Sequence, residues 1–172
     1  MMILRIKAAN MRGSRAHVIF PQARRRILLL FAEAIPASSA EGLVTKPSAH
    51  SVDTMLDRLE AASKERGFII FTRIDHAAAA QSLGLKMPRS TVLVYGNPRV
   101  GTPRFIQHPT LAIDFPPKAL VWEDADGKVW LSYNTSQWTK VIDSRHGVSP
   151  SPPEAMARAD AALEAAADAA TK

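Results

Sequence analysis

The sequence predicts a single α+β domain, built on a four- to five-stranded, mostly antiparallel sheet with helices packed on one face. Two short runs, FIIFTRI (68–74) and TVLVYG (91–96), are rich in β-branched and aromatic residues and predict buried strands. A longer segment, KALVWEDADGKVWLSYN (118–134), has two strand-like arms around Asp126-Gly127 and predicts a β-hairpin. Helical segments separate the first strands along the chain, which favours an α+β fold.

Capping residues and helical spacing predict the other early elements. GLVTKPS (42–48) predicts a short strand. Ser51 can accept an unpaired backbone N–H and begin a helix that Gly67 ends. Asp75 can begin a second helix that ends at Gly84. The first helix carries an apolar stripe at helical spacing: Val52, Met55, Leu56, Leu59 and Ala62.

The segment 94–117, VYGNPRVGTPRFIQHPTLAIDFPP, combines five prolines with several apolar residues. Its proline density predicts a stiff, irregular crossover and not a helix. We expect its apolar residues to hold it against the sheet: Phe105, Ile106, Leu111, Ile113 and Phe115. The same segment has a second interpretation as the wall of a binding pocket, because irregular segments on a rigid scaffold often carry binding groups.

The predicted domain covers residues 41–148, and its last element is a helix in TSQWTKVIDSRHG, closed by Gly147. Residues 149–172 form a proline-rich spacer followed by an alanine-rich helix with few bulky apolar side chains. We expect this last helix to dock weakly, to be shared with a partner subunit, or to fray.

The net charge of +6 comes entirely from the basic N-terminal extension, residues 1–40. That extension holds seven Lys and Arg residues and one acid, whereas the rest of the chain carries fifteen of each sign. A neutral domain lacks the basic surface that phosphate binding requires, so we expect no nucleic-acid partner.

Residues 24–40, RRRILLLFAEAIPASSA, have the order of a secretory signal: basic residues, an apolar run, then small residues before a cut after Ala40. We therefore expect export to the periplasm or the medium. Glu33 interrupts the apolar run, so a cytoplasmic protein is the alternative. The apolar run is shorter than the ~20 residues of a membrane span, and we expect no stable membrane insertion.

Several phrases of the sequence occur together in a known family. These are HSV…DRLEAASKERGFIIFTRIDHAAAA, GNPRVGTP, HPTLAIDFPPKALVWED, and DGKVWLSYN followed by RHG. Over about residues 42–148 the chain resembles the bacterial domain-of-unknown-function family numbered 302. The resemblance implies a compact α+β domain that is often dimeric and frequently follows an export signal. It implies no reaction.

No catalytic or metal-binding motif is present in the sequence. The chain has no cysteine, no paired histidines at metal-ligand spacing, no phosphate-binding glycine loop and no GxSxG nucleophile elbow. We therefore predict no catalytic residue and no metal ligand, and no cofactor is indicated.

We predict ligand contacts from the polar groups of the 97–114 segment, with an aromatic side chain of the hairpin across from them. They are Asn97, Thr102, His108 and Asp114, together with Trp130 or Tyr133. The sequence thus predicts a non-catalytic, exported, homodimeric module that binds a small or hydrophobic ligand or a partner protein. The alternative is a metal-dependent enzyme or redox accessory protein that uses His76, His108 and Asp114.

Overall fold

The computed structural model describes residues 41–172, so the signal-like segment 24–40 and the predicted cut after Ala40 lie outside the described residues. The described chain forms five strands, five α-helices and one 3₁₀ helix, η1. In chain order they are β1 (Leu43–Pro47), α1 (Val52–Glu65), β2 (Ile69–Asp75), α2 (His76–Ser82), β3 (Ser90–Gly96), α3 (Pro98–Gln107), η1 (Pro109–Ile113), β4 (Lys118–Glu123), β5 (Val129–Asn134), α4 (Ser136–Arg145) and α5 (Pro153–Thr171).

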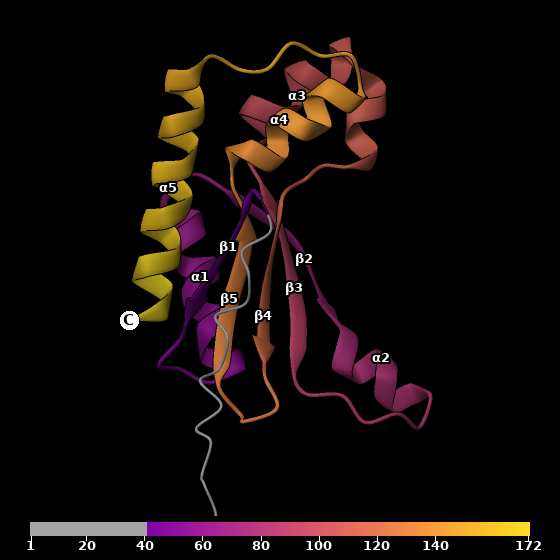
Figure 1. Cartoon of the computed structure of the whole chain (residues 1–172), viewed down its shortest axis with the longest axis vertical. Helices are drawn as coiled ribbons and strands as arrows, with labels where there is room; N and C mark the ends of the chain where they lie inside the picture. The colour runs from indigo at the N-terminus through magenta and orange to yellow at the C-terminus, as the bar shows by residue number, and fades with distance from the viewer. Residues whose placement is uncertain (1–40) are drawn as a thin grey trace, which may run out of the picture. The chain divides into compact units, whose positions relative to one another are not determined.

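The five strands form one antiparallel sheet in the order β1-β5-β4-β3-β2 (Figure 1). The predicted α+β class and the predicted hairpin are both confirmed. The β4–β5 hairpin pairs Val121 with Leu131, and Gly127 in its turn has φ 78°. Asp124 fixes this turn, because its Oδ1 accepts the backbone N–H groups of Asp126 and Lys128 at 3.0 and 2.9 Å.

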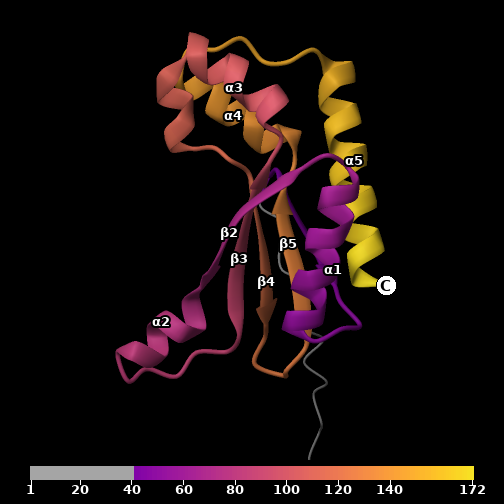
Figure 2. The ribbon, with the colours of Figure 1, turned by 180° about the vertical axis from the view of Figure 1, so that it is seen from behind.

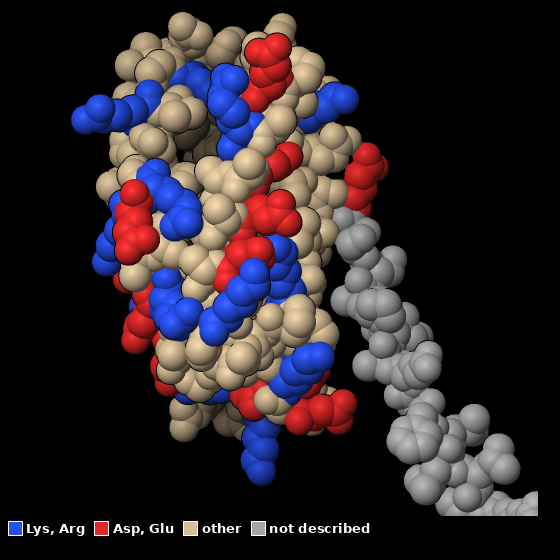
Figure 3. All heavy atoms as spheres, turned by 90° about the vertical axis from the view of Figure 1, so that its left-hand side faces the viewer, with Lys and Arg blue, Asp and Glu red and all other residues tan. Residues whose placement is uncertain are grey.

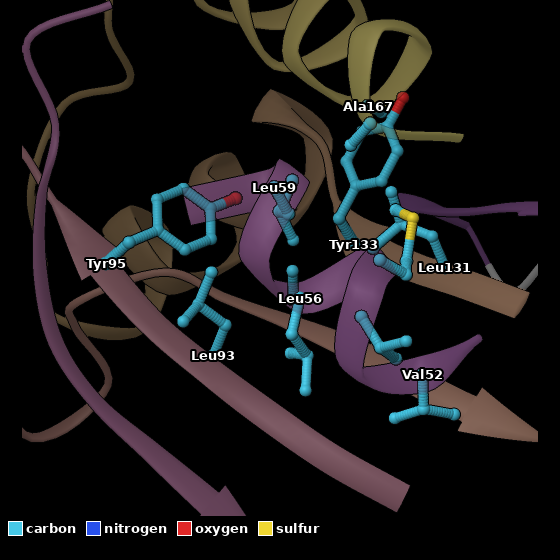
Figure 4. Close-up of a cluster of buried hydrophobic side chains, with 12 residues drawn as sticks. Val52, Leu56, Leu59, Leu93, Tyr95, Leu131, Tyr133 and Ala167 are labelled. Carbon is cyan, nitrogen blue, oxygen red and sulfur yellow. The ribbon is translucent and has the colours of Figure 1, made fainter. Parts of the chain in front are cut away.

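Helices α1 and α5 cover one face of the sheet, as predicted, and the core lies between them and the strands (Figure 2). Side chains alternate along a strand, so every second residue of β3, β4 and β5 points into this core. Figure 4 shows the result, with Leu93 and Leu131 on the strands facing Leu56 and Leu59 of α1. The predicted stripe of α1 is completely buried.

Helix α1 begins where its capping residue predicts. The Ser51 side chain accepts the backbone N–H of Thr54 at 3.3 Å, and Asp53 in the first turn complements the helix dipole. Gly67 follows the helix with φ 77°, a conformation that residues with a Cβ rarely adopt. The second helix is capped by Asp75 in the same way, through the N–H of Ala78 at 2.9 Å.

Helix α5 is ordered against α1 in spite of its few bulky residues. Ala167 and Ala170 are part of the core, and Ala166 is also buried. Alanine removes side-chain bulk, so the two helix backbones can approach closely. Arg58 of α1 completes the contact, donating to the backbone carbonyls of Ala169 and Ala170 at 2.9 and 3.2 Å.

The predicted burial of the 68–74 strand is wrong. Its strand, β2, forms an edge of the sheet and is largely exposed, with half of Phe71 accessible to solvent. Composition identifies a strand, but the place of the strand in the sheet depends on long-range pairing. The 91–96 strand, β3, lies inside the sheet and is buried as predicted.

The prediction that segment 94–117 contains no helix is also wrong. Helix α3 begins at Pro98, the first helical position, where the missing N–H of proline has no partner to lose. Asn97 caps this helix. The apolar residues of the segment do not all pack: Leu111 is fully buried, whereas Ile106 and Ile113 are about three-quarters exposed.

The position of α5 predicts a clear stability difference between two neighbouring alanines. Ala167→Asp should lower the free energy of unfolding by about 3 kcal/mol or more, because it buries a carboxylate with no partner. Ala169→Asp, on the exposed side of the same helix, should change it by less than about 0.5 kcal/mol. Urea denaturation of both variants measures the difference. Equal stabilities would mean that α5 is not part of the folded core.

Candidate functional site

Helices α3 and α4 and the 3₁₀ helix η1 lie together at one end of the sheet, and we call residues 97–117 and 135–148 the end lobe (Figure 1). Its interior is aromatic. The ring of Phe115 lies 6.1 Å from that of Phe105 and 5.4 Å from that of Trp138, which joins η1 to α3 and α4.

His146, the residue after α4, links two residues of the η1 region. Its Nε2 lies 2.7 Å from Oδ2 of Asp114, and its Nδ1 lies 2.9 Å from Oγ1 of Thr110. The His146 side chain is only 9% exposed. Thr110, His146 and Asp114 therefore form a continuous hydrogen-bonded chain, which we call the Thr-His-Asp chain.

The carboxylate end of this chain is held negative. The hydrogen bond from His146 lowers the pKa of Asp114, and the charge of Arg145 at 3.2 Å adds to that effect. An ionised carboxylate only accepts hydrogen bonds, so Nε2 of His146 carries a proton. In the neutral imidazole the lone pair is then on Nδ1 and faces the Thr110 hydroxyl.

An ion pair with a buried carboxylate and a partly exposed arginine lies in the same lobe. Arg104 of α3 donates to Oδ1 of Asp143 on α4, and its guanidinium also lies over the Phe115 ring at 5.3 Å. Asp143 is fully buried, and its Oδ2 has no hydrogen-bond partner among the described residues. Removing Arg104 would leave an unpaired buried charge, so this pair ties α3 firmly to α4.

Four of the sequence-predicted ligand contacts lie in the end lobe. Asn97 caps α3 through the backbone N–H of Arg99 at 3.0 Å, and Thr102 is exposed on that helix. His108 is half-buried at the junction of α3 and η1. Asp114 belongs to the Thr-His-Asp chain. Sequence reasoning missed Thr110 and His146, because only the fold brings them to Asp114.

The two aromatic candidates lie on opposite faces of β5. Tyr133 points under α5 into the core, and burial raises the pKa of its hydroxyl. Trp130 is on the other face and near the hairpin turn, away from the end lobe (Figure 1). The structure therefore does not gather the six predicted residues around one pocket.

The second face of the sheet carries no helix among the described residues (Figures 1 and 2). We call it the helix-free face. Strand register and alternation assign its side chains, several of which are apolar: Ile69, Ile74, Val92, Val94, Leu120, Trp122 and Trp130.

The indole groups of the helix-free face are already hydrogen-bonded. Trp122 and Trp130 stack with ring centroids 6.1 Å apart. The Trp122 N–H donates to Oγ of Ser132 at 3.0 Å, and the Trp130 N–H donates to Oδ2 of Asp124 at 2.7 Å. Lys128 Nζ lies over the Trp130 ring, 4.2 Å from its centroid, so the rings combine apolar surface with one cation contact, and their N–H groups are satisfied internally.

Helix α2 and the loop after it, residues 76–89, project from the sheet, and we call them the α2 arm (Figure 1). No residue of α2 is buried. Leu83 and Leu85 are largely exposed, and Leu85 and Met87 line a groove that also includes Ala78 and Gln81.

The cavity between the sheet and helices α1 and α5 is too small for a ligand. The cavity beside Tyr95 and Tyr133 measures about 10 Å³, enough for no more than one water molecule. The described residues contain no cluster of three or more side chains able to hold a metal ion. None of the described helices is long and apolar enough to cross a membrane.

The surface on the α5 side has mixed charge (Figure 3). Lysines and arginines alternate there with acids, as where Lys46 of β1 reaches Asp168 and Glu164 of α5 at 2.5 and 3.4 Å. This side therefore presents no extended field of one sign.

Comparison with known proteins identifies similar sequences and a similar fold. The profile of the family described as "Domain of unknown function DUF302" matches residues 44–169. A crystal structure of an uncharacterized conserved protein DUF302 from Bacillus stearothermophilus superimposes with a TM-score of 0.65 and 18% identity, covering 76% of this chain and 99% of that chain.

Two curated relatives are named as channels. The chain is 41% identical over 107 residues to the fluoride-specific ion channel FluC 1 of Brucella suis, covering 62% of this chain and 41% of that protein. The match to FluC 1 of Brucella abortus has the same identity and covers 38% of that protein. The chain thus spans about two fifths of the length of these relatives.

The hydrogen bond from His146 should lower the pKa of the Asp114 carboxyl. In the wild type, Asp114 should titrate below the ordinary Asp value of about 3.9. The bonds of the Asp114 carboxylate to His146 and Arg145 therefore stabilise the fold at pH values above the ordinary Asp pKa. This stabilisation is lost as the pH falls through the lowered pKa of Asp114 in the folded protein. His146→Ala should move the pKa of Asp114 upward, and NMR titration of the carboxyl carbon measures it. His76→Ala, far away on α2, is the control. An unchanged Asp114 titration in His146→Ala would contradict the assigned hydrogen bond.

Proposed function

The chain belongs to the family of domain of unknown function DUF302, and on this premise we propose that it is an exported, homodimeric module that binds a hydrophobic ligand or a partner protein. The observation that carries the proposal is the helix-free face. Apolar side chains of four strands converge there without a covering helix among the described residues. Ile69 and Ile74 are exposed there, and four others are half-buried: Val92, Leu120, Trp122 and Trp130. Part of the apolar area thus remains accessible, as it does on binding surfaces.

The chemistry of this face indicates the kind of ligand. The indole N–H groups of Trp122 and Trp130 are bonded to the protein itself and are not available to a ligand. Val92 and Leu120 add aliphatic surface beside them. Burying apolar surface contributes about 25 cal/mol per Å² to the free energy of binding. A ligand that covers this face with apolar area, either a flat apolar molecule or an apolar protein surface, therefore fits best.

The relatives named as channels support a partner protein. In those proteins the segment similar to this chain makes up about two fifths of the length. A domain of this type therefore occurs joined to other polypeptide. We propose that this chain makes a comparable association with a separate protein.

The α2 arm supports a homodimer. A seven-residue helix is marginal by itself in water, and α2 buries none of its side chains in its own domain. The arm lies next to β2, an edge strand with exposed Phe71 and Ile74. A second copy of the chain would cover both the apolar arm and the open strand edge.

Export rests on residues 24–40, which lie outside the described residues. This segment supports export because three arginines are followed by an apolar run and then by small residues, the order of a secretory signal.

Two lysine substitutions separate the two proposed surfaces, each acting as the control for the other. Leu120→Lys on the helix-free face should weaken binding of a co-purified ligand or partner roughly tenfold or more, with the dimer intact. Leu85→Lys on the α2 arm should dissociate the dimer with binding retained. Native mass spectrometry of protein isolated from its host identifies bound molecules, and sedimentation gives the mass.

A different result would contradict each of the two proposed surfaces. Ligand or partner binding that survives Leu120→Lys would remove the helix-free face as the binding surface. A wild-type chain that sediments as a monomer at micromolar concentration would remove the dimer. Thermal melting of both variants checks that the domain remains folded.

Processing after Ala40 is the expected result for an exported chain. N-terminal sequencing of protein recovered from the periplasm or medium of its host should begin at Glu41. Protein confined to the cytosol with an intact N-terminus would contradict export.

A further inference from the structure

We propose that Thr110 is a nucleophile activated by His146 and Asp114, and that the end lobe carries a site for hydrolysis of small apolar carboxylic esters. This activity goes beyond binding on the helix-free face and does not depend on it. It rests on the order, spacing and exposure of the three residues of the Thr-His-Asp chain.

The hydrogen bonds have the geometry of a nucleophile, a general base and a group that orients the base. Nδ1 of His146 lies 2.9 Å from the Thr110 hydroxyl, within the reach that proton transfer requires. Nε2 lies 2.7 Å from Asp114, which fixes the imidazole with its basic nitrogen toward Thr110. Such an arrangement is recognised by geometry and roles, whatever the order of the residues along the chain.

A nucleophile must be accessible to its substrate, whereas the residues that activate it can be shielded from solvent. The side chains of His146 and Asp114 are 9% and 18% exposed, whereas Thr110 is exposed to solvent. The proton-accepting pair is thus shielded by the lobe. The hydroxyl is the member of the chain that a substrate can reach.

Structural bracing alone does not account for both hydrogen bonds. Thr110 and Asp114 belong to the same short segment, η1 and its C-terminal cap. The bond from His146 to Asp114 already ties that segment to the end of α4. The second bond directs the hydroxyl proton of Thr110 at the unprotonated Nδ1 of His146.

The neighbouring residues indicate the substrate class. Ile106 and Ile113 lie on either side of Thr110 in the sequence and are largely exposed, so they can contact an apolar acyl group. Arg145 is bound to Asp114 at 3.2 Å, on the side of His146 away from Thr110, so its charge holds the carboxylate that orients the imidazole. An ester with a small apolar acyl group and a good leaving alcohol fits these contacts.

The reaction needs only the ester and water. Oγ1 of Thr110 bonds to the carbonyl carbon as its proton passes to Nδ1 of His146, and the carbonyl π pair moves to oxygen. Collapse breaks the carbon–alkoxide bond, and the alkoxide leaves with the proton from Nδ1. Water then attacks the acyl-threonine in the same way, releasing the acid and restoring the Thr110 hydroxyl.

Acylation by p-nitrophenyl butyrate tests the proposal on the full chain. Acid quenching followed by peptide mass spectrometry should find the butyryl group on Thr110. His146→Gln, which removes the base, should reduce adduct formation on Thr110 about 100-fold or more. Thr110→Val, which has no hydroxyl to acylate, gives the background of the measurement. Thr110→Ser should retain adduct formation. Thr102→Val, at an exposed threonine on α3, should leave it unchanged.

Two results would overturn the proposal. One is the absence of an adduct on Thr110 in folded wild-type protein. The other is an adduct that forms at the same rate in folded His146→Gln, since a solvent-exposed hydroxyl would then be reacting unaided. Thermal melting establishes that each variant is folded. If His146→Gln unfolds, the wild type decides the test: acylation of Thr110 no faster than that of the exposed Thr102 would equally overturn the proposal.

Discussion

The structure depends on the one-sided burial of its sheet. Antiparallel strands alternate their side chains between two faces, and the described chain supplies helices for only one of them. Helix α1 contributes the bulky residues of that interface, and α5 contributes alanines that let the two helices lie close together. The helix-free face then carries apolar side chains with no cover from the described helices, and the remaining short elements gather beyond the strand ends. The proposed binding surface and the end lobe are both consequences of this arrangement.

The two regions differ in how they are held. In the end lobe, the ion pair of Arg104 with the buried Asp143 and the aromatic contacts of Phe115 fix three short elements that have little regular core of their own. A rigid lobe is a condition for the Thr-His-Asp chain to have defined chemistry, because proton transfer depends on maintained hydrogen-bond geometry. The helix-free face needs no such precision. Its stacked tryptophans and aliphatic side chains can accept apolar surfaces of different shape, which suits a module that binds through contact area.

Local chemistry predicted most elements but not their place in the sheet. Ser51, Asp75 and the Asp126-Gly127 turn identified their elements correctly, because caps and tight turns depend on neighbouring residues alone. The exposure of β2 followed from strand order, which no local pattern carries. Helix α3 was excluded wrongly, since Pro98 occupies the first helical position, where proline is tolerated. The candidate site was only partly predictable: Asp114 was found, but His146 is 32 residues away along the chain and meets it only through the packing of α4 on η1.

Hydroxyl-radical footprinting of the two stacked tryptophans tests the central claim that the helix-free face is a binding surface. Protein isolated from its host would be oxidised before and after its bound molecules are extracted. We predict that Trp122 and Trp130 are protected before extraction and oxidised after it, whereas buried Tyr95 stays unmodified in both samples. Equal oxidation of the tryptophans before and after extraction would contradict it.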